Sequence, residues 1–88
     1  MPTIRIPTPL RQFTGGNSEV PVSGDTVNAA LSDLAARHPD LRKHLYGDNG
    51  ELRAFVNIFL GQDDVRHLQG VNTALKENDQ LRIVPSVA

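Results

Sequence analysis

The sequence predicts an α+β fold in which a mixed four- to five-stranded sheet packs on one main helix. Three features predict it: two short alternating segments near the start, an amphipathic helix in the first half, and further alternating segments in the second half. This order is typical of a fold whose helix covers one face of a sheet. The 88 residues are interpreted as a single domain, 1–88, with one core layer.

The first two strands are predicted where polar and apolar residues alternate, at Thr3–Pro7 and Glu19–Val22. Prolines at the end of the first segment and just beyond it terminate that strand, because proline cannot donate a hydrogen bond to a sheet ladder. The glycine-containing stretch 13–17 is expected to form a loop or a wide hairpin turn. Pro21 lies inside the second segment, which favours an edge strand.

One long helix is predicted between a cap at Asp25 or Thr26 and Pro39. Either cap residue can accept hydrogen bonds from the free amides of the first turn, and Pro39 is expected to stop the helix. A short helical turn is expected at Leu41–Tyr46, followed by a loop at 47–50. The apolar residues of the long helix share one face: Val27, Ala30, Leu31, Leu34 and Ala35.

The clearest strand signal is the alternating segment Arg53–Leu60. Its core-facing side is predicted to carry Ala54, Val56, Ile58 and Leu60, and its other side Arg53, Phe55, Asn57 and Phe59. Two explanations remain open for the outward phenylalanines. Either a loop or the helical region covers them, or they form a docking patch for a partner, since exposed aromatic clusters mark interfaces.

The rest of the chain completes the sheet. Residues 61–64 are expected to turn the chain, Val65–Leu68 to form a short strand, and Thr73–Leu75 a single helical turn. The last strand is predicted at Gln80–Val84, with Leu81 and Ile83 facing inward and Arg82 and Val84 outward, and Pro85 is expected to end it. A first and a last strand side by side in the middle of such a sheet form the β-grasp arrangement.

Composition and charge exclude several function classes. The net charge is −1, from nine Lys plus Arg and ten Asp plus Glu, and no cluster of basic residues is present, so neither nucleic acid nor an anionic membrane is expected as a partner. No cysteine is present, which excludes disulfides and thiolate metal sites and is compatible with a cytoplasmic location. Residues 1–10 lack the apolar core of a signal peptide.

No catalytic residues and no metal site are predicted, so the chain is not expected to be an enzyme. His38, His44 and His67 lack the short spacing of metal ligands, and they are interpreted as ordinary surface histidines. Asp63 and Asp64 are interpreted as solvated acids in a turn, because calcium loops need alternating acids and a closing glutamate.

Three segments resemble the MoaD/ThiS family of ubiquitin-like sulfur carrier proteins. The first is Phe55–Leu60 followed by Asp63–Arg66, and the second is Leu75–Leu81, which resembles the loop into the family's final strand. The third, Ile83–Ala88, resembles the family's end just before its terminal Gly-Gly. Residues 10–11, 14–16 and 23–26, with the strand at 55–57, look most like the cysteine-biosynthesis (CysO-type) branch.

The resemblance implies a carrier chemistry. A partner enzyme of the ubiquitin-activating type would use ATP to adenylate the C-terminal carboxylate. A sulfur donor would then displace the AMP and leave a terminal thiocarboxylate, and a sulfur-accepting synthase would take the sulfur. The carrier itself would bind no permanent cofactor. The tail leading to the thiocarboxylate would be Pro85, Ser86, Val87 and Ala88. Docking onto the activating enzyme would use Phe59, Leu60 and Val84, although Leu60 conflicts with its predicted inward direction.

The printed sequence ends at Ala88 without the Gly-Gly of the family. Three explanations stay open: the glycines lie beyond the printed residues, they are removed by processing, or this is a non-conjugating relative. The expected pathway is cysteine biosynthesis, with molybdopterin or thiamin as alternatives. The alternative from another class is a β-grasp module that binds proteins and never carries sulfur.

Overall fold

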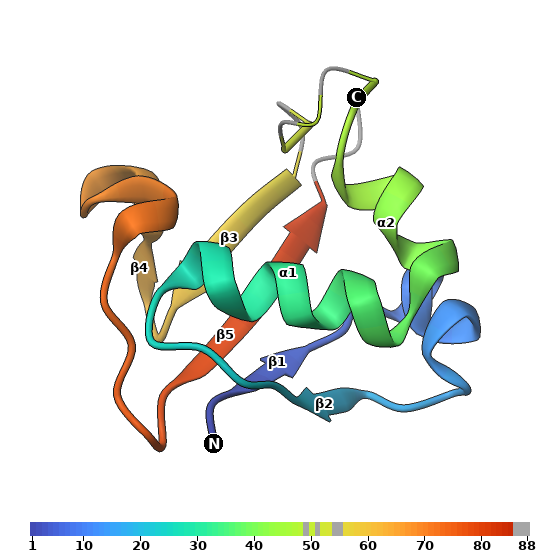
Figure 1. Ribbon diagram of the computed structural model, residues 1–88, viewed down its shortest axis with the longest axis horizontal. Helices are drawn as coiled ribbons and strands as arrows, with labels where there is room; N and C mark the ends of the chain where they lie inside the picture. Colours follow the sequence, from blue (N-terminus) through green and yellow to red (C-terminus); the bar gives the residue numbers. More distant parts are fainter. Residues whose placement is uncertain (49, 51, 54–55, 86–88) are drawn as a thin grey trace.

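A computed structural model describes the chain except residues 49, 51, 54–55 and 86–88 (Figure 1). Its five-stranded sheet has the order β2-β1-β5-β3-β4. The strands are β1 (Thr3–Arg5), β2 (Glu19–Pro21), β3 (Val56–Leu60), β4 (Asp63–Asp64) and β5 (Gln80–Pro85). The central pair β1 and β5 is parallel, and the other pairs are antiparallel. The predicted β-grasp arrangement is therefore confirmed, and β2 is an edge strand as Pro21 indicated.

Helix α1 (Val27–Arg37) lies across one face of the sheet, and α2 (Pro39–Leu45) follows it directly (Figure 1). Three short 3-10 helices complete the fold: η1 (Thr8–Thr14), η2 (Val65–His67) and η3 (Gly70–Asn72). Thr26, one of the two predicted caps, accepts a hydrogen bond through Oγ1 from the Ala29 amide at 3.1 Å. This bond satisfies one of the free amides of the first turn of α1.

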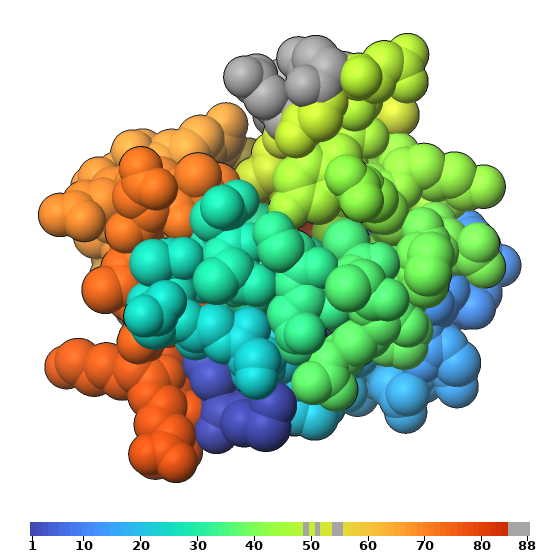
Figure 2. Space-filling model, in the orientation of Figure 1, coloured from blue at the N-terminus to red at the C-terminus, as the bar shows by residue number. Residues whose placement is uncertain are grey.

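The core lies between α1 and the sheet. The predicted apolar face of α1 is buried, and Figure 2 shows α1 filling the middle of this side of the molecule. From the sheet, the core receives Ile4, Val20, Val56, Ile58, Leu81 and Ile83, and α2 adds Leu41 and Leu45. On β3 and β5 buried residues alternate with more exposed ones, which confirms the predicted inward direction of Val56, Ile58, Leu81 and Ile83.

Proline positions explain where two short helices begin in the first half. Residues 8–14 form the 3-10 helix η1, with a proline in its first turn, so the predicted loop at 13–17 begins with the last two residues of η1 and continues as a turn at 15–16. Pro39 follows the end of α1, but it also begins α2, which starts two residues before the predicted turn. Proline suits the first helical position because its missing amide would lack an intrahelical partner there anyway.

The second half differs from prediction at five places. The turn at 61–64 contains the short strand β4, and Val65–Leu68 is not a strand but contains η2. The predicted helical turn at Thr73–Leu75 lies three residues earlier, as η3. Pro85 belongs to β5 instead of lying after it, and it pairs with Val56. Arg53 precedes β3, while the predicted directions of Ala54 and Phe55 lie outside the described residues.

Candidate functional site

The candidate site is the face of β3 and β5 that points away from α1, which we call the outer face. Val84 on β5 lies opposite Asn57 on β3, and Arg82 lies opposite Phe59. Since directly paired residues project to the same side of a sheet, these four side chains form one patch. The structure therefore brings together Phe59 and Val84, two of the three predicted docking residues, as diagonal neighbours.

Leu60 is the exception among the predicted docking residues. It pairs with Leu81, which is fully buried, and its own side chain packs against the core. Side chains alternate along β3, so Leu60 lies on the opposite face from Phe59. The conflict noted in the sequence is thus resolved in favour of the inward direction, and Leu60 does not share the outer face.

Phe59 is partly exposed, and because side chains alternate along β3 it points to the side opposite the buried Ile58, away from α1. The guanidinium carbon of Arg82 lies 5.2 Å from the centroid of its ring, within the range of a cation–π contact. On its other side Phe59 pairs with Asp64 of β4. Phe59 is therefore an aromatic surface between a cation and an acid.

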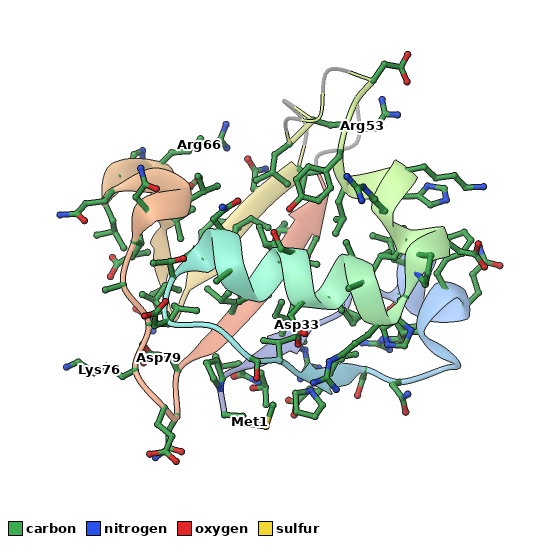
Figure 3. All side chains as sticks on the ribbon, in the orientation of Figure 1. Met1, Asp33, Arg53, Arg66, Lys76 and Asp79 are labelled. Atoms are coloured by element: carbon green, nitrogen blue, oxygen red, sulfur yellow. The ribbon has the colours of Figure 1, made fainter. Side chains whose placement is uncertain are left out.

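A polar network fixes the edge of the outer face beside η2. Asp64 accepts hydrogen bonds from the Arg66 amide at 2.9 Å and from the Arg66 guanidinium at 3.3 Å, and Arg66 also donates to Asn57 Oδ1. The hydrogen bond from the Arg66 backbone amide is the main cause that lowers the pKa of Asp64. The charges of Arg66 and His67 lower the pKa further, whereas burial raises it. Arg66 is the middle residue of η2 and is labelled in Figure 3.

The sequence did not single out Arg66, Asn57 or Arg82 as site residues. Arg82 and Asn57 had been assigned to the outward side of their strands, but their neighbours depend on the register of strands far apart in the sequence. The tail is reached through Pro85, which pairs with Val56 at the end of β5 beside the start of β3. Its continuation Ser86, Val87 and Ala88 lies outside the described residues.

The three histidines lie in separate places. His38 lies between α1 and α2, His67 lies in η2, and the His44 ring stacks on Phe13 with centroids 4.3 Å apart. In the ranges that the structure describes, no three His, Cys, Asp or Glu side chains come together as a metal site would require. No helix in those same ranges is long and apolar enough to cross a membrane.

Comparison with known proteins matches residues 4–88 to the ThiS family. The chain is 42% identical to the sulfur carrier protein CysO of Mycobacterium tuberculosis, over 98% of this chain and 95% of that protein. It is 36% identical to a putative sulfur carrier protein of Archaeoglobus fulgidus, over 97% of this chain and 93% of the other.

Solved structures agree with the sequence comparison. The fold superposes on a chain of the Amycolatopsis orientalis BexX/CysO complex with a TM-score of 0.90 and 35% identity, covering 100% of this chain and 98% of that one. The resemblance to the CysO-type branch is therefore confirmed. The β-grasp sheet, the family match and the similarity to these relatives agree. The chain belongs to the ThiS family of sulfur carriers.

Proposed function

We propose that this chain carries sulfur for cysteine biosynthesis as a thiocarboxylate at its C-terminus. The observation that carries the proposal is the 42% identity to CysO over almost the whole of both chains. In this proposal the chain is a protein co-substrate, while catalysis belongs to its partners. Those partners are an adenylating enzyme of the ubiquitin-activating type, which uses ATP, and a sulfur-accepting synthase of the cysteine synthase kind. The relative CysO of Amycolatopsis orientalis was solved in complex with BexX, which supports a partner-dependent role.

The geometry supports this role through the strand that leads to the tail. A carboxylate reacts with a sulfur nucleophile only after a good leaving group is attached, so the tail must enter an activating enzyme. β5 is held between β1 and β3, and this fixes the position of Pro85, from which the tail begins. Phe59 and Val84 lie on the outer face of this strand pair, where they would contact the enzyme that receives the tail, Pro85–Ala88. The absence of cysteine leaves the carrier no thiol that could take the activated acyl group.

The test uses the full-length protein encoded by the gene, incubated with ATP, a sulfide source and the adenylating enzyme of the same genome. Intact mass should show one oxygen replaced by one sulfur, and omission of ATP should abolish the change. Adding the synthase and its acceptor should consume the thiocarboxylate, because its sulfur bonds to the acceptor and displaces the acceptor's leaving group. Hydrolysis of the resulting acyl–sulfur bond by water should then return the carrier to its original mass and release the sulfur-containing product. A carrier whose mass stays unchanged with every adenylating enzyme of that genome would refute the proposal and favour a β-grasp interaction module.

A further inference from the structure

A row of four charged residues and one phenylalanine crosses all five strands on the side of the sheet away from α1. The paired positions run in the order Glu19 on β2, Arg5 on β1, Arg82 on β5, Phe59 on β3 and Asp64 on β4. Because paired residues share a face, these side chains all lie on the side away from α1. Two arginines therefore lie next to each other in the row, and its acids lie only at the two ends.

Both acids already have a cation. Glu19 lies 3.7 Å from the Arg5 guanidinium, and Asp64 lies 3.3 Å from that of Arg66. Arg82 differs from these arginines: within the part of the chain that the structure describes, no carboxylate lies within ion-pair distance of it. Its side chain is exposed, and its guanidinium lies over the Phe59 ring. The middle of the outer face thus presents one uncompensated positive charge.

This arrangement has an energetic cost in the isolated protein. Like charges directly opposite one another on neighbouring strands destabilise a sheet, and Arg82 lies opposite Arg5. The cation–π contact with Phe59 offsets part of that cost and also orients the guanidinium. An arginine that is oriented in advance loses less conformational freedom when it forms an ion pair with another protein.

The position of Arg82 indicates what it would meet. It lies two residues before Val84 on the same face of β5, so an enzyme that covers Phe59 and Val84 would cover Arg82 as well. Removing the Arg82 guanidinium from water is costly if the opposing surface offers no negative charge. A carboxylate in that surface would offset the cost of desolvation and the repulsion between Arg82 and Arg5. The outer face therefore fits an acidic surface better than a neutral one.

We propose that Arg82, held over Phe59, forms an ion pair with an Asp or Glu side chain of the enzyme that activates the C-terminus. Arg82 is then a specificity-determining residue, because an enzyme with a neutral or basic group at that place would lose affinity. This inference rests on the proposed function, since it assumes that an adenylating enzyme binds the outer face.

Binding of the full-length carrier to the adenylating enzyme of the same genome tests it, by calorimetry at low and high salt. We expect Arg82→Gln to weaken binding by roughly tenfold and to reduce its salt dependence, and Arg82→Glu to weaken it further. The matched control is Arg37→Gln, which removes the same charge from an arginine of α1 that is paired with Asp33. This control should bind within about twofold of the wild type, since a distant surface charge contributes little.

Two further measurements make the test decisive. A charge reversal of one enzyme acid to Lys should weaken the wild type and restore binding of Arg82→Glu. The thermal midpoint of Arg82→Gln should stay near that of the wild type, because the lost cation–π contact and the relieved repulsion oppose each other. Binding of Arg82→Gln equal to that of Arg37→Gln at both salt concentrations would overturn the assignment.

The failure of the proposed function has a different signature. Intact mass at saturating enzyme reports thiocarboxylate formation by the wild type independently of the affinity of the variants. A wild type that is converted, with Arg82→Gln bound equally well, refutes the ion pair alone. A wild type that is neither bound nor converted refutes the carrier proposal and the ion pair together.

Discussion

The carboxylate of Asp33 accepts a hydrogen bond from the backbone amide of Ser23 at 2.9 Å. Asp33 lies in the middle of α1, and Ser23 lies in the segment that enters the helix, so this bond ties the helix to the chain before it (Figure 3). The same carboxylate forms an ion pair with Arg37 one turn later at 2.8 Å. The hydrogen bond from the Ser23 backbone amide is the main cause that lowers the pKa of Asp33. Burial raises the pKa, and Arg37 lowers it further.

Asp33→Asn should therefore reduce stability in a pH-dependent way. A folded-state pKa below the unfolded value means that the carboxylate stabilises the fold fully above about pH 4, and that this contribution is lost as pH falls through the folded pKa. We expect the variant to be less stable by roughly 0.5–1 kcal/mol at neutral pH, because the amide of Asn still accepts a hydrogen bond. Urea denaturation between about pH 2 and 7 measures the difference, which should shrink below about pH 4.

Asp48→Asn, which removes an exposed carboxylate from a loop, is the control for net charge. A difference between wild type and Asp33→Asn that stays constant down to acid pH would show that the Asp33 charge does not contribute to stability.

Gly24→Ala should destabilise the protein through a steric clash. A Cβ on Gly24 would lie 2.7 Å from the Ala30 nitrogen and 2.9 Å from Ala29 Cβ, so either α1 or its entering segment must move. Such overpacking costs about 1–3 kcal/mol. Gly16→Ala is the comparison, because Gly16 has φ +85° but no atom within 4 Å of its Cβ position. Equal losses for the two variants in urea denaturation would contradict the clash.

Thr26→Ala should cost about 1 kcal/mol, since it removes the side-chain acceptor for the Ala29 amide at the start of α1. Thr26→Ser keeps an equivalent hydroxyl and should recover most of that loss. The free energy of unfolding of the three proteins provides the measurement, and similar losses for both variants would argue against a role for the hydroxyl.

Val84→Ala tests the apolar part of the outer face. If Val84 contacts the activating enzyme, removal of its two methyl groups should raise the KM of thiocarboxylate formation by roughly tenfold, with little change in kcat. Leu68→Ala is the matched control, because Leu68 is apolar and 44% exposed and lies at the end of η2. The two kinetic constants, followed by intact mass, separate a loss of binding from a loss of folded protein. Equal KM values for the two variants would remove Val84 from the docking face.

Much of the central architecture followed from the sequence because it depends on periodicity. Alternation in β3 and the apolar stripe of α1 each indicate a buried face without knowledge of the neighbours. The short elements were missed for a physical reason: they depend on single contacts. η2 begins where the Asp64 side chain accepts the Arg66 amide, and β4 exists because two acidic residues pair with Phe59 and Leu60.

The candidate site shows the same division. Phe59 and Val84 were predicted to lie on one face, and the strand register places them there. The isolation of Arg82 could not be predicted, because it depends on which residues of β1 and β3 lie beside it. Most of the chain separates Arg82 from its neighbour on β1, and the segment that contains η2 and η3 separates it from its neighbour on β3.

The central position of β5 has a consequence for synthesis. The ribosome makes β5 after all the other strands, yet β5 fills the place between β1 and β3. The sheet cannot close until those residues have left the exit tunnel, and pairing of such distant segments is a slow step in folding. Because β5 also carries Arg82 and Val84, a nascent or misfolded chain does not assemble the outer face. An enzyme that binds this face would therefore distinguish finished carriers from unfinished ones before it spends ATP.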